Sequence, residues 1–172
     1  MNIRLITEQD AELLSAYYKE NDTHFNPWVP KRQGGFHEID LWRGRVREYV
    51  ILQERGEAAY FAAVAKNRIL SHCNVTQILR GHFLACYMSF GVSVESEGKS
   101  IAFNTCKIAI GYAFNDLGLH RIMANYMPHN NRSAKLLARL GFVKEGLAKN
   151  YLKIGGEWQN HVLTSLTNCA SE

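Results

Sequence analysis

The stretch "HRIMANYMPHNNRSAKLLARLGF", residues 120–142, carries the clearest fold signal in this sequence. It opens with an apolar run typical of a buried strand, passes through an asparagine-rich turn, and continues with apolar residues at helical spacing. Gly141 follows the last helical residue, and glycine is a common helix stop. We therefore predict a strand, a tight turn and a short helix in direct succession.

The residues on either side of this stretch predict the remaining elements. A first strand is expected at 2–7, and Thr7 is expected to begin a helix with Asp10 in a reciprocal cap. The segment 20–35 is predicted to be a long polar and aromatic loop. The periodicity further predicts a helix within 36–56, strands at 58–65, 68–79 and 82–94, a helix at 100–117, a strand at 121–127, a helix at 131–140, and a closing hairpin around Gly155–Gly156. This order predicts an α+β fold, with a mostly antiparallel sheet and one strand-helix-strand crossover.

Length and composition are typical of a soluble globular domain. A chain of 172 residues can bury a sizeable core, and 47% hydrophobic with 21% charged residues argues against disorder. No apolar run approaches the ~20 residues of a membrane span, and the first residues lack the apolar segment of a signal peptide. We expect a single domain over 1–172 that is cytoplasmic and has no membrane partner.

Charge and cysteine patterns argue against two further classes. The formal net charge is +4 without a run of five basic residues, so we expect no direct sequence-specific binding of nucleic acid. The four cysteines contain no CxxC pair, so we expect buried free thiols and no metal site. They are Cys73, Cys86, Cys106 and Cys169.

The stretch "SVESEGKSIAFN", residues 93–104, is a candidate anion site. An apolar strand ends near Val94, and the chain passes through Gly98 into a helical pattern, which leaves free helix N–H groups at about 98–102. An ordinary strand-to-helix turn would show the same pattern. The residues of this stretch alone leave both interpretations open.

The order of motifs around 120–142 resembles the Gcn5-related N-acetyltransferase (GNAT) family. In that family N-x-x-[AS]…LGF follows a pyrophosphate-binding turn at similar spacing. The stretch "HRIMANYMPHNNRSAKLLARLGFVKEGLAKNYL" is similar to the branch that acetylates ribosomal proteins at an N-terminal alanine. So are "NPWVP" (26–30) and "RGHFLACY" (80–87). The resemblance covers nearly the whole chain and is strongest over 120–167.

The resemblance implies a sheet splayed between its two central strands, with acetyl-CoA in the opening. The backbone of the strand before the turn would bind the pantetheine arm like an added β-strand. The turn at 97–102 would hold the pyrophosphate. The cofactor-binding residues implied in this way are Val92, Val94, Gly98, Lys99, Ser100, Ala102 and Asn130.

The turn departs from the family pattern Gln/Arg-x-x-Gly-x-Gly/Ala at two positions. The pattern falls on Glu97, Ser100 and Ala102, and only Ala102 conforms. A carboxylate at ~5 Å from phosphate in an effective dielectric of ~20 costs roughly 3 kcal/mol. That cost would weaken cofactor binding by about one to two orders of magnitude, with Lys99 offsetting part of it. We therefore expect weaker binding of the cofactor, but not a loss of binding.

Acetyl transfer from a thioester to an amine needs a neutral amine, close approach, donors for the oxyanion and a proton for the leaving thiolate. Relatives often have a tyrosine where this chain has Leu137, so Ser133 is the hydroxyl that the resemblance assigns to the thiolate. Ser133 could equally just cap its helix together with Asn130. Trp28, with Phe25, is expected to line the acceptor channel, and Tyr151 is a further candidate there.

The general base is left open by the sequence. Glu145, Glu157 and His129 are candidates by residue type, and surface solvation is the preferred interpretation for the two glutamates. Asn160 stands where relatives often carry an acid. For His161 we favour a strand residue without a catalytic role.

The leading hypothesis is an acetyl-CoA-dependent N-acetyltransferase that modifies a protein N-terminal α-amine by direct attack in a ternary complex. The expected partners are acetyl-CoA and a protein N-terminus, with a ribosomal protein that begins with alanine as the first acceptor; the oligomeric state, including a homodimer, is left open. One alternative is a small-amine acetyltransferase acting on a polyamine or an antibiotic, which the basic charge disfavours. The other is a non-catalytic, ribosome-associated or CoA-binding relative with a degenerate turn.

Overall fold

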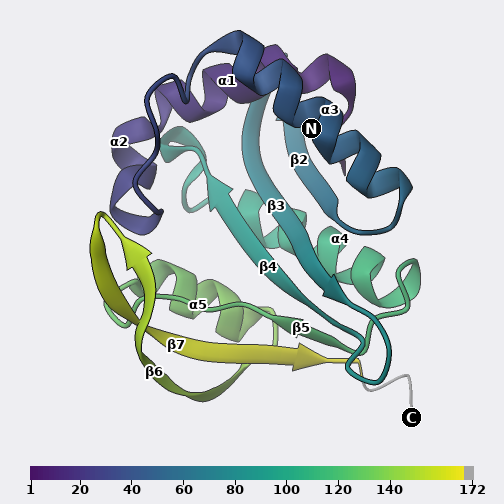
Figure 1. Cartoon of the computed structure of the whole chain (residues 1–172), viewed down its shortest axis with the longest axis vertical. Helices are drawn as coiled ribbons and strands as arrows, with labels where there is room; N and C mark the ends of the chain where they lie inside the picture. Colours follow the sequence, from purple (N-terminus) through teal and green to yellow (C-terminus); the bar gives the residue numbers. More distant parts are fainter. Residues whose placement is uncertain (169–172) are drawn as a thin grey trace.

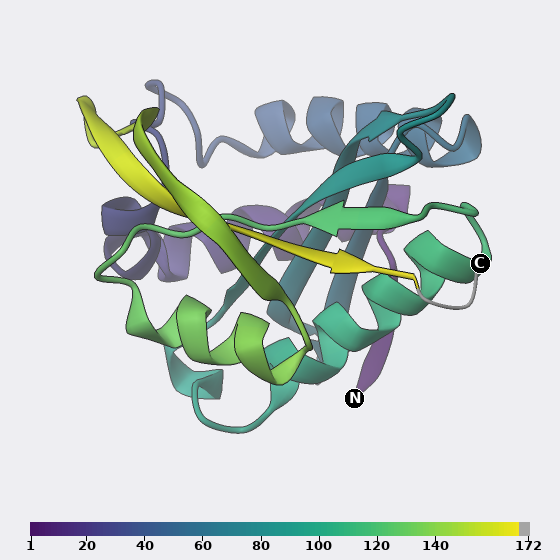
Figure 2. The same ribbon diagram turned by 90° about the horizontal axis from the view of Figure 1, so that it is seen from below.

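The chain folds around one seven-stranded sheet with helices on both faces (Figure 1, Figure 2). The computed structural model describes residues 1–168. The strands are β1 (Asn2–Leu5), β2 (Ala59–Ala65), β3 (Arg68–Leu79), β4 (Ala85–Val92), β5 (Arg121–Met123), β6 (Val143–Ile154) and β7 (Glu157–Thr167). The helices are α1 (Ala11–Glu20), α2 (Asp22–Phe25), α3 (Ile39–Glu54), α4 (Ile101–Asn115) and α5 (Asn131–Arg139), with 3-10 turns η1 (Glu8–Asp10), η2 (Asn26–Trp28) and η3 (Val94–Ser96). This order confirms the predicted α+β fold class.

The strands lie in the order β1-β2-β3-β4-β5-β7-β6. Neighbouring strands are antiparallel except β4 and β5, which are parallel and joined through α4. The predicted single crossover is therefore confirmed. The predicted closing hairpin is also confirmed, because Gly155 and Gly156 separate β6 from β7, and both have positive φ angles of 60° and 96°.

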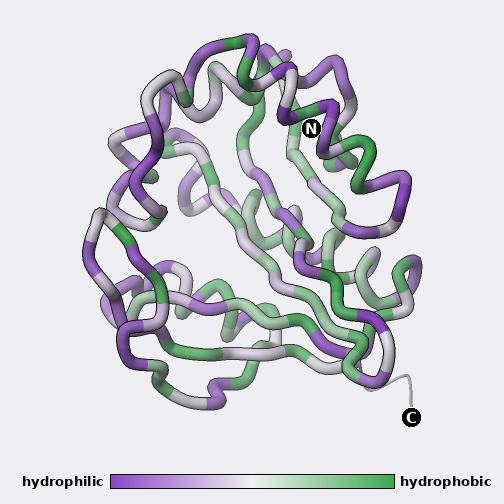
Figure 3. Tube along the Cα trace, in the orientation of Figure 1, coloured by the Kyte–Doolittle hydropathy of each residue, from purple (hydrophilic) through white to green (hydrophobic). Residues whose placement is uncertain are grey.

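Helices on the two faces bury two separate apolar clusters. One cluster lies under α1 and α3 and includes Leu14, Trp42 and Val46. The other lies under α4 and α5 and includes Cys106 and Leu137. Figure 3 shows the hydrophobic stretches concentrated along the central strands and α4. We call these two sides the α1/α3 face and the α4/α5 face.

The two central strands diverge, as the resemblance implies. β4 and β5 pair only from Ala85–Tyr87 to Arg121–Met123, whereas β4 continues to Val92 (Figure 1). Beyond this point β4 has no strand partner on its β5 side within the described residues. The divergence opens the sheet at its centre.

Two predicted strands are shorter than expected. The strand predicted at 121–127 is regular only to Met123, because its neighbour β4 moves away; the chain then pairs with β7 through a single bridge from Tyr126 to Val162. The strand predicted at 82–94 ends at Val92, since the Val94 N–H donates instead to Asn21 Oδ1 at 2.9 Å.

The segment predicted as a loop at 20–35 contains two short helical turns. α2 places Phe25 in the core beneath α1, and η2 follows directly. Pro27 lies in the first turn of η2, where a missing N–H breaks no helical hydrogen bond. Turns this short lack the repeated apolar spacing that sequence periodicity detects.

The cysteines of the described region are buried free thiols, as predicted. Burial raises the pKa of the Cys86 thiol to about 12, and burial likewise raises that of Cys73. Cys169 lies outside the described residues. Across residues 1–168 no helix is both long and apolar enough to cross a membrane, and no cluster of three metal-binding side chains is found.

Candidate active site

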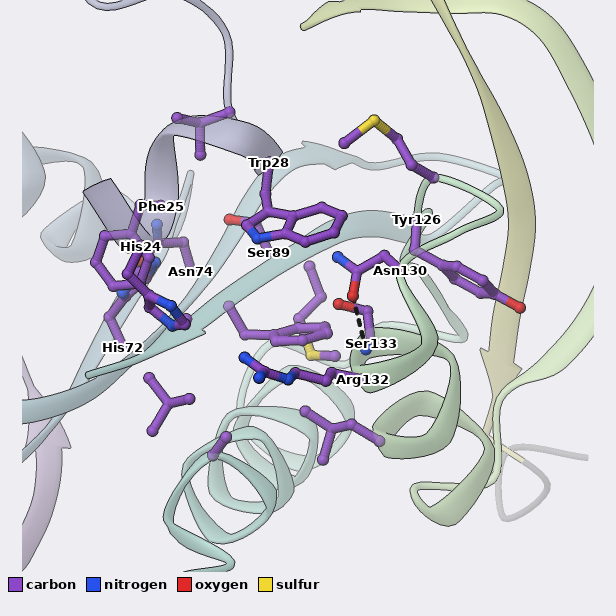
Figure 4. A pocket seen from close by; sticks show the side chains of 18 of the residues that line it. His24, Phe25, Trp28, His72, Asn74, Ser89, Tyr126, Asn130, Arg132 and Ser133 are labelled. Atoms are coloured by element: carbon purple, nitrogen blue, oxygen red, sulfur yellow. Dashed lines mark hydrogen bonds between the residues drawn. The ribbon is translucent and has the colours of Figure 1, made fainter. Parts of the chain in front are cut away.

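A cavity of about 410 Å³ occupies the opening between β4 and β5. Its lining comes from the segment between α1 and Arg32, β3, β4, the turn before α4 and its start, the β5–α5 connection, α5 and β7. Five of the predicted site residues line it: Trp28, Val92, Ala102, Asn130 and Ser133. Figure 4 shows Asn130 and Ser133 on one side, with His24, Phe25 and His72 on the other. Val94, Gly98, Lys99, Ser100 and Tyr151 do not line it.

The cavity reaches both faces of the sheet because side chains alternate along a strand. Met88 and Phe90 of β4 pack into the cluster on the α4/α5 face. Ser89 and Gly91 therefore face the α1/α3 side, where they lie opposite Asn74 and His72 of β3. A molecule on each side of β4 could thus reach the same opening.

The turn before α4 has the backbone of an anion-binding loop. Gly98 and Ser100 have positive φ angles of 71° and 57°. The Ser100 side chain makes no capping hydrogen bond to α4; its hydroxyl accepts a hydrogen bond from Arg139 at 3.2 Å. The N–H groups of the first turn are therefore left for another acceptor. A left-handed serine costs about 1 kcal/mol or more, which explains why glycine suits this position.

Glu97 is not the unpaired carboxylate that the sequence led us to expect. Its side chain accepts a hydrogen bond from Arg132 at the start of α5 and lies 3.3 Å from His24 Nε2 of α2. The expected helper, Lys99, donates instead to the Glu95 carbonyl at 2.7 Å. Glu97 therefore connects three segments around the cavity, and Arg132 balances its charge. Sequence spacing gave no sign of this pairing because 35 residues separate the partners.

Val94, one of the predicted cofactor residues, lies outside the cavity and its backbone N–H is engaged elsewhere. The backbone N–H of Val94 donates to Asn21, and its side chain is exposed. Val94 therefore lies beyond the end of β4, and its contact with the cofactor stays a prediction. Val92 remains in β4 and lines the cavity.

Asn130 caps α5, and Ser133 lies one turn into that helix. Asn130 Oδ1 accepts the backbone N–H of Ser133 at 3.1 Å, as the dashed line in Figure 4 shows. The cap uses the backbone of Ser133, so its hydroxyl is not consumed by it. Both side chains face the cavity. The two roles weighed for Ser133 are thus compatible.

Tyr151 lies on β6, outside the lining of the cavity, with its ring 5.5 Å from that of His161. Its hydroxyl accepts a hydrogen bond from Asn125 Nδ2 at 3.0 Å and lies 3.5 Å from the Tyr87 hydroxyl. Burial and the Tyr87 hydroxyl raise the pKa of Tyr151 to about 12. The phenol therefore stays protonated at neutral pH. Asn125, which the sequence did not single out, lines the cavity in its place.

The α1/α3 side of the cavity is aromatic. The Trp28 ring lies 5.5 Å from that of His129, so η2 contacts the β5–α5 connection. His72 accepts or donates a hydrogen bond at Nδ1 with Tyr17, at 3.1 Å. Gly91 makes room for that ring, because a Cβ at position 91 would lie 2.5 Å from His72 Cε1. Burial, with a contribution from Arg32, lowers the pKa of His72 to about 4, so it is neutral at physiological pH.

The candidates for a general base differ in whether they line the cavity and in which residues they contact. Glu145 is paired with Arg121 and accepts from Ser165 at 2.9 Å, outside the cavity; the Arg121 hydrogen bond lowers its pKa. Glu157 begins β7 and is exposed. Asn160 accepts the Asn150 N–H at 2.9 Å. His161 lines the cavity and is buried, although the sequence favoured no role for it.

Comparisons with known proteins agree with this architecture. Residues 1–143 match the family model described as an acetyltransferase (GNAT) domain. The chain is 41% identical to the [ribosomal protein uS5]-alanine N-acetyltransferase of Escherichia coli, over 96% of this chain and 86% of that protein. It is 29% identical to a probable N-acetyltransferase of Bacillus subtilis, over 96% and 93% of the two chains.

Two solved structures have a fold similar to that of this chain. The ribosomal-protein-S5-alanine acetyltransferase of Vibrio fischeri superposes with a TM-score of 0.95 at 40% identity, covering 99% of this chain and 94% of that one. RimJ of Mycobacterium smegmatis in complex with CoA-disulfide superposes with a TM-score of 0.87 at 25% identity, covering 96% and 80%. The chain therefore belongs to the GNAT family, and it is an N-acetyltransferase.

Proposed function

We propose that this enzyme transfers the acetyl group of acetyl-CoA to the N-terminal α-amine of a ribosomal protein that begins with alanine. The observation that carries the proposal is the cavity itself, which passes between β4 and β5 and connects the two faces of the sheet. A donor on the α4/α5 side and an acceptor on the aromatic side can meet there in one ternary complex. The 41% identity to an enzyme named for that substrate supports the choice of acceptor.

The residues present fit acetyl-CoA as the donor. The free edge of β4 up to Val92 can pair with an extended pantetheine arm. The uncapped start of α4, with Ala102 in the cavity wall, suits a pyrophosphate. Bound acetyl-CoA supplies the activated thioester. Asn130 and Ser133 lie at the start of α5, beside the same opening.

The chemistry needs no covalent enzyme intermediate. A neutral α-amine attacks the thioester carbonyl, the C–S bond breaks, and the thiolate takes a proton. The Ser133 hydroxyl is our candidate for delivering that proton, because it faces the cavity and takes no part in the helix cap. An α-amine has a pKa near 8 (about 7.7–8.0), so a minority is already neutral at pH 7.

The charge of the cavity disfavours a polyamine acceptor. Among its described lining residues the one carboxylate is Glu97, and Arg132 and His24 pair with it. Arg32, on the aromatic side, is itself paired with Asp22 at 2.6 Å. A polycation would find no free acid there, whereas the single amine of a peptide needs none.

The experiment is acetylation of synthetic N-terminal peptides of ribosomal proteins by the purified enzyme, followed by CoA release and mass spectrometry. We expect acetylation of the α-amine of alanine-initiated peptides and none of matched peptides whose α-amine is already blocked. Spermidine should compete poorly. Acetylation of spermidine in preference to every peptide would overturn the proposal, and so would the absence of calorimetric heat with millimolar CoA.

A further inference from the structure

His161 lies on the acceptor side of the cavity, on the strand β7. Its neighbour Val162 packs into the cluster on the α4/α5 face. Since side chains alternate along a strand, His161 points to the opposite, α1/α3 face. Val162 also exchanges backbone hydrogen bonds with Tyr126, at 2.8 and 3.2 Å, which fixes this part of β7 beside the cavity wall. His161 is therefore placed across the sheet from Ser133.

Hydrogen bonding fixes the tautomer of His161. Its Nδ1 lies 3.1 Å from the backbone carbonyl oxygen of Gln159. A carbonyl oxygen only accepts hydrogen bonds, so Nδ1 must carry the proton. In the neutral imidazole the other nitrogen, Nε2, then holds a lone pair and can only accept.

The lone pair on Nε2 is open to the cavity. Within residues 1–168, the buried side-chain polar atoms without a partner are His37 Nδ1 and Ser93 Oγ. His161 Nε2 is not one of them, and its ring makes no hydrogen bond other than that of Nδ1. A nitrogen that has no partner and is not buried must reach open space, and the space that His161 lines is the cavity.

The other histidines around the cavity are less suited to accept a proton. His72 has a pKa of about 4, lowered by burial, and Tyr17 leaves its tautomer undefined. His24 faces the carboxylate of Glu97. His129 is exposed and lies against Trp28, outside the lining of the cavity. Among these four, only His161 combines burial in the cavity wall with a hydrogen bond that assigns the donor role to one ring nitrogen and leaves the other as an acceptor.

We propose that His161 is the general base of the acetyl transfer, a proposal that rests on the function proposed above. As the acceptor amine forms its C–N bond to the thioester carbonyl, one N–H proton passes to His161 Nε2 and leaves an imidazolium whose Nδ1–H still donates to Gln159. Collapse of the tetrahedral adduct breaks the C–S bond, the thiolate takes the proton of the Ser133 hydroxyl, and solvent reprotonates Ser133. The imidazolium returns its proton to solvent, so the products are the acetylated amine and CoA.

The kinetic test is His161→Gln, which keeps a polar side chain of similar reach but no titrating group. We expect kcat to fall by about 100-fold, the low end for a general base, with the peptide KM and the CoA Kd within about twofold of wild type. His82→Gln, on the exposed β3–β4 loop, is the matched control and should keep wild-type kcat. Saturable recovery of His161→Ala by added imidazole would support the proposal, and wild-type kcat in His161→Gln would overturn it.

A second measurement needs no variant. Long-range ¹H–¹⁵N correlation of the wild-type protein reports which ring nitrogen carries the proton. We expect His161 as the Nδ1–H tautomer at neutral pH, and an Nε2–H tautomer would overturn the proposal. If the wild-type enzyme acetylates no peptide at all, the proposed function fails, a result distinct from an active His161→Gln enzyme.

Discussion

At the scale of single residues, the surroundings of the turn before α4 explain how the charge of Glu97 is balanced. The carboxylate of Glu97 is balanced by Arg132 and His24 rather than by its sequence neighbour Lys99. An incoming pyrophosphate would compete with Glu97 for Arg132, which is mostly exposed and free to move. The cost of the carboxylate is therefore shared between breaking an ion pair and like-charge repulsion.

Replacing Glu97 with glutamine should tighten CoA binding. The change removes the repulsion and frees Arg132 for phosphate, so we expect the Kd from calorimetry to fall by about threefold to tenfold. Glu95→Gln is the matched control, since Glu95 carries the same charge two residues away, does not line the cavity and pairs with Arg68. Arg132→Ala should weaken binding, and equal affinities in all three variants would contradict this account.

Replacing Ser133 with alanine should slow turnover without unfolding α5. The cap of that helix uses the Ser133 N–H, which alanine keeps. A thiolate is a good leaving group, so we expect kcat to fall by about 10-fold to 100-fold with little change in KM. An unchanged kcat in steady-state assays would leave Ser133 with its backbone role alone.

At the scale of elements, α5 is a short helix whose start serves both stability and the site. The helix has nine residues, and Asn130 provides its side-chain cap beside the cavity. Leu137, the position where relatives often carry a tyrosine, is buried in the α4/α5 cluster. In the proposed reaction, the donor is therefore Ser133 in the first turn of the helix, which lines the cavity.

Substitutions of Asn130 can separate these two roles. Asn130→Ala should lower the free energy of unfolding by about 1 kcal/mol, the usual cost of a lost N-cap. Asn130→Asp keeps a good cap but adds a negative charge near the expected phosphate side, so it should retain stability in urea unfolding yet bind CoA more weakly. If Asn130→Asp bound CoA as tightly as wild type, the residue would act as a cap only.

At the scale of the whole molecule, the sheet opens because β4 and β5 pair over only three residues each. The sequence predicted the order of the elements well, since apolar periodicity and turn residues are local signals. It also located Trp28, Val92, Ala102, Asn130 and Ser133, all of which line the cavity. It did not show which residues Val94 and Glu97 would contact, because their partners Asn21 and Arg132 are far away in the sequence.

The amino-acid sequence by itself determined the fold class and the position of the turn before α4, and its motifs carry the resemblance to the GNAT family. The fold class and the turn follow from hydrophobic period and helix caps, which act over a few residues at a time. Only the tertiary structure decided which charges meet around the cavity and which ring nitrogen of His161 is free. Those properties depend on contacts between segments that are far apart in the sequence. They also depend on which face of the sheet each side chain occupies, and no local pattern specifies the register of the sheet.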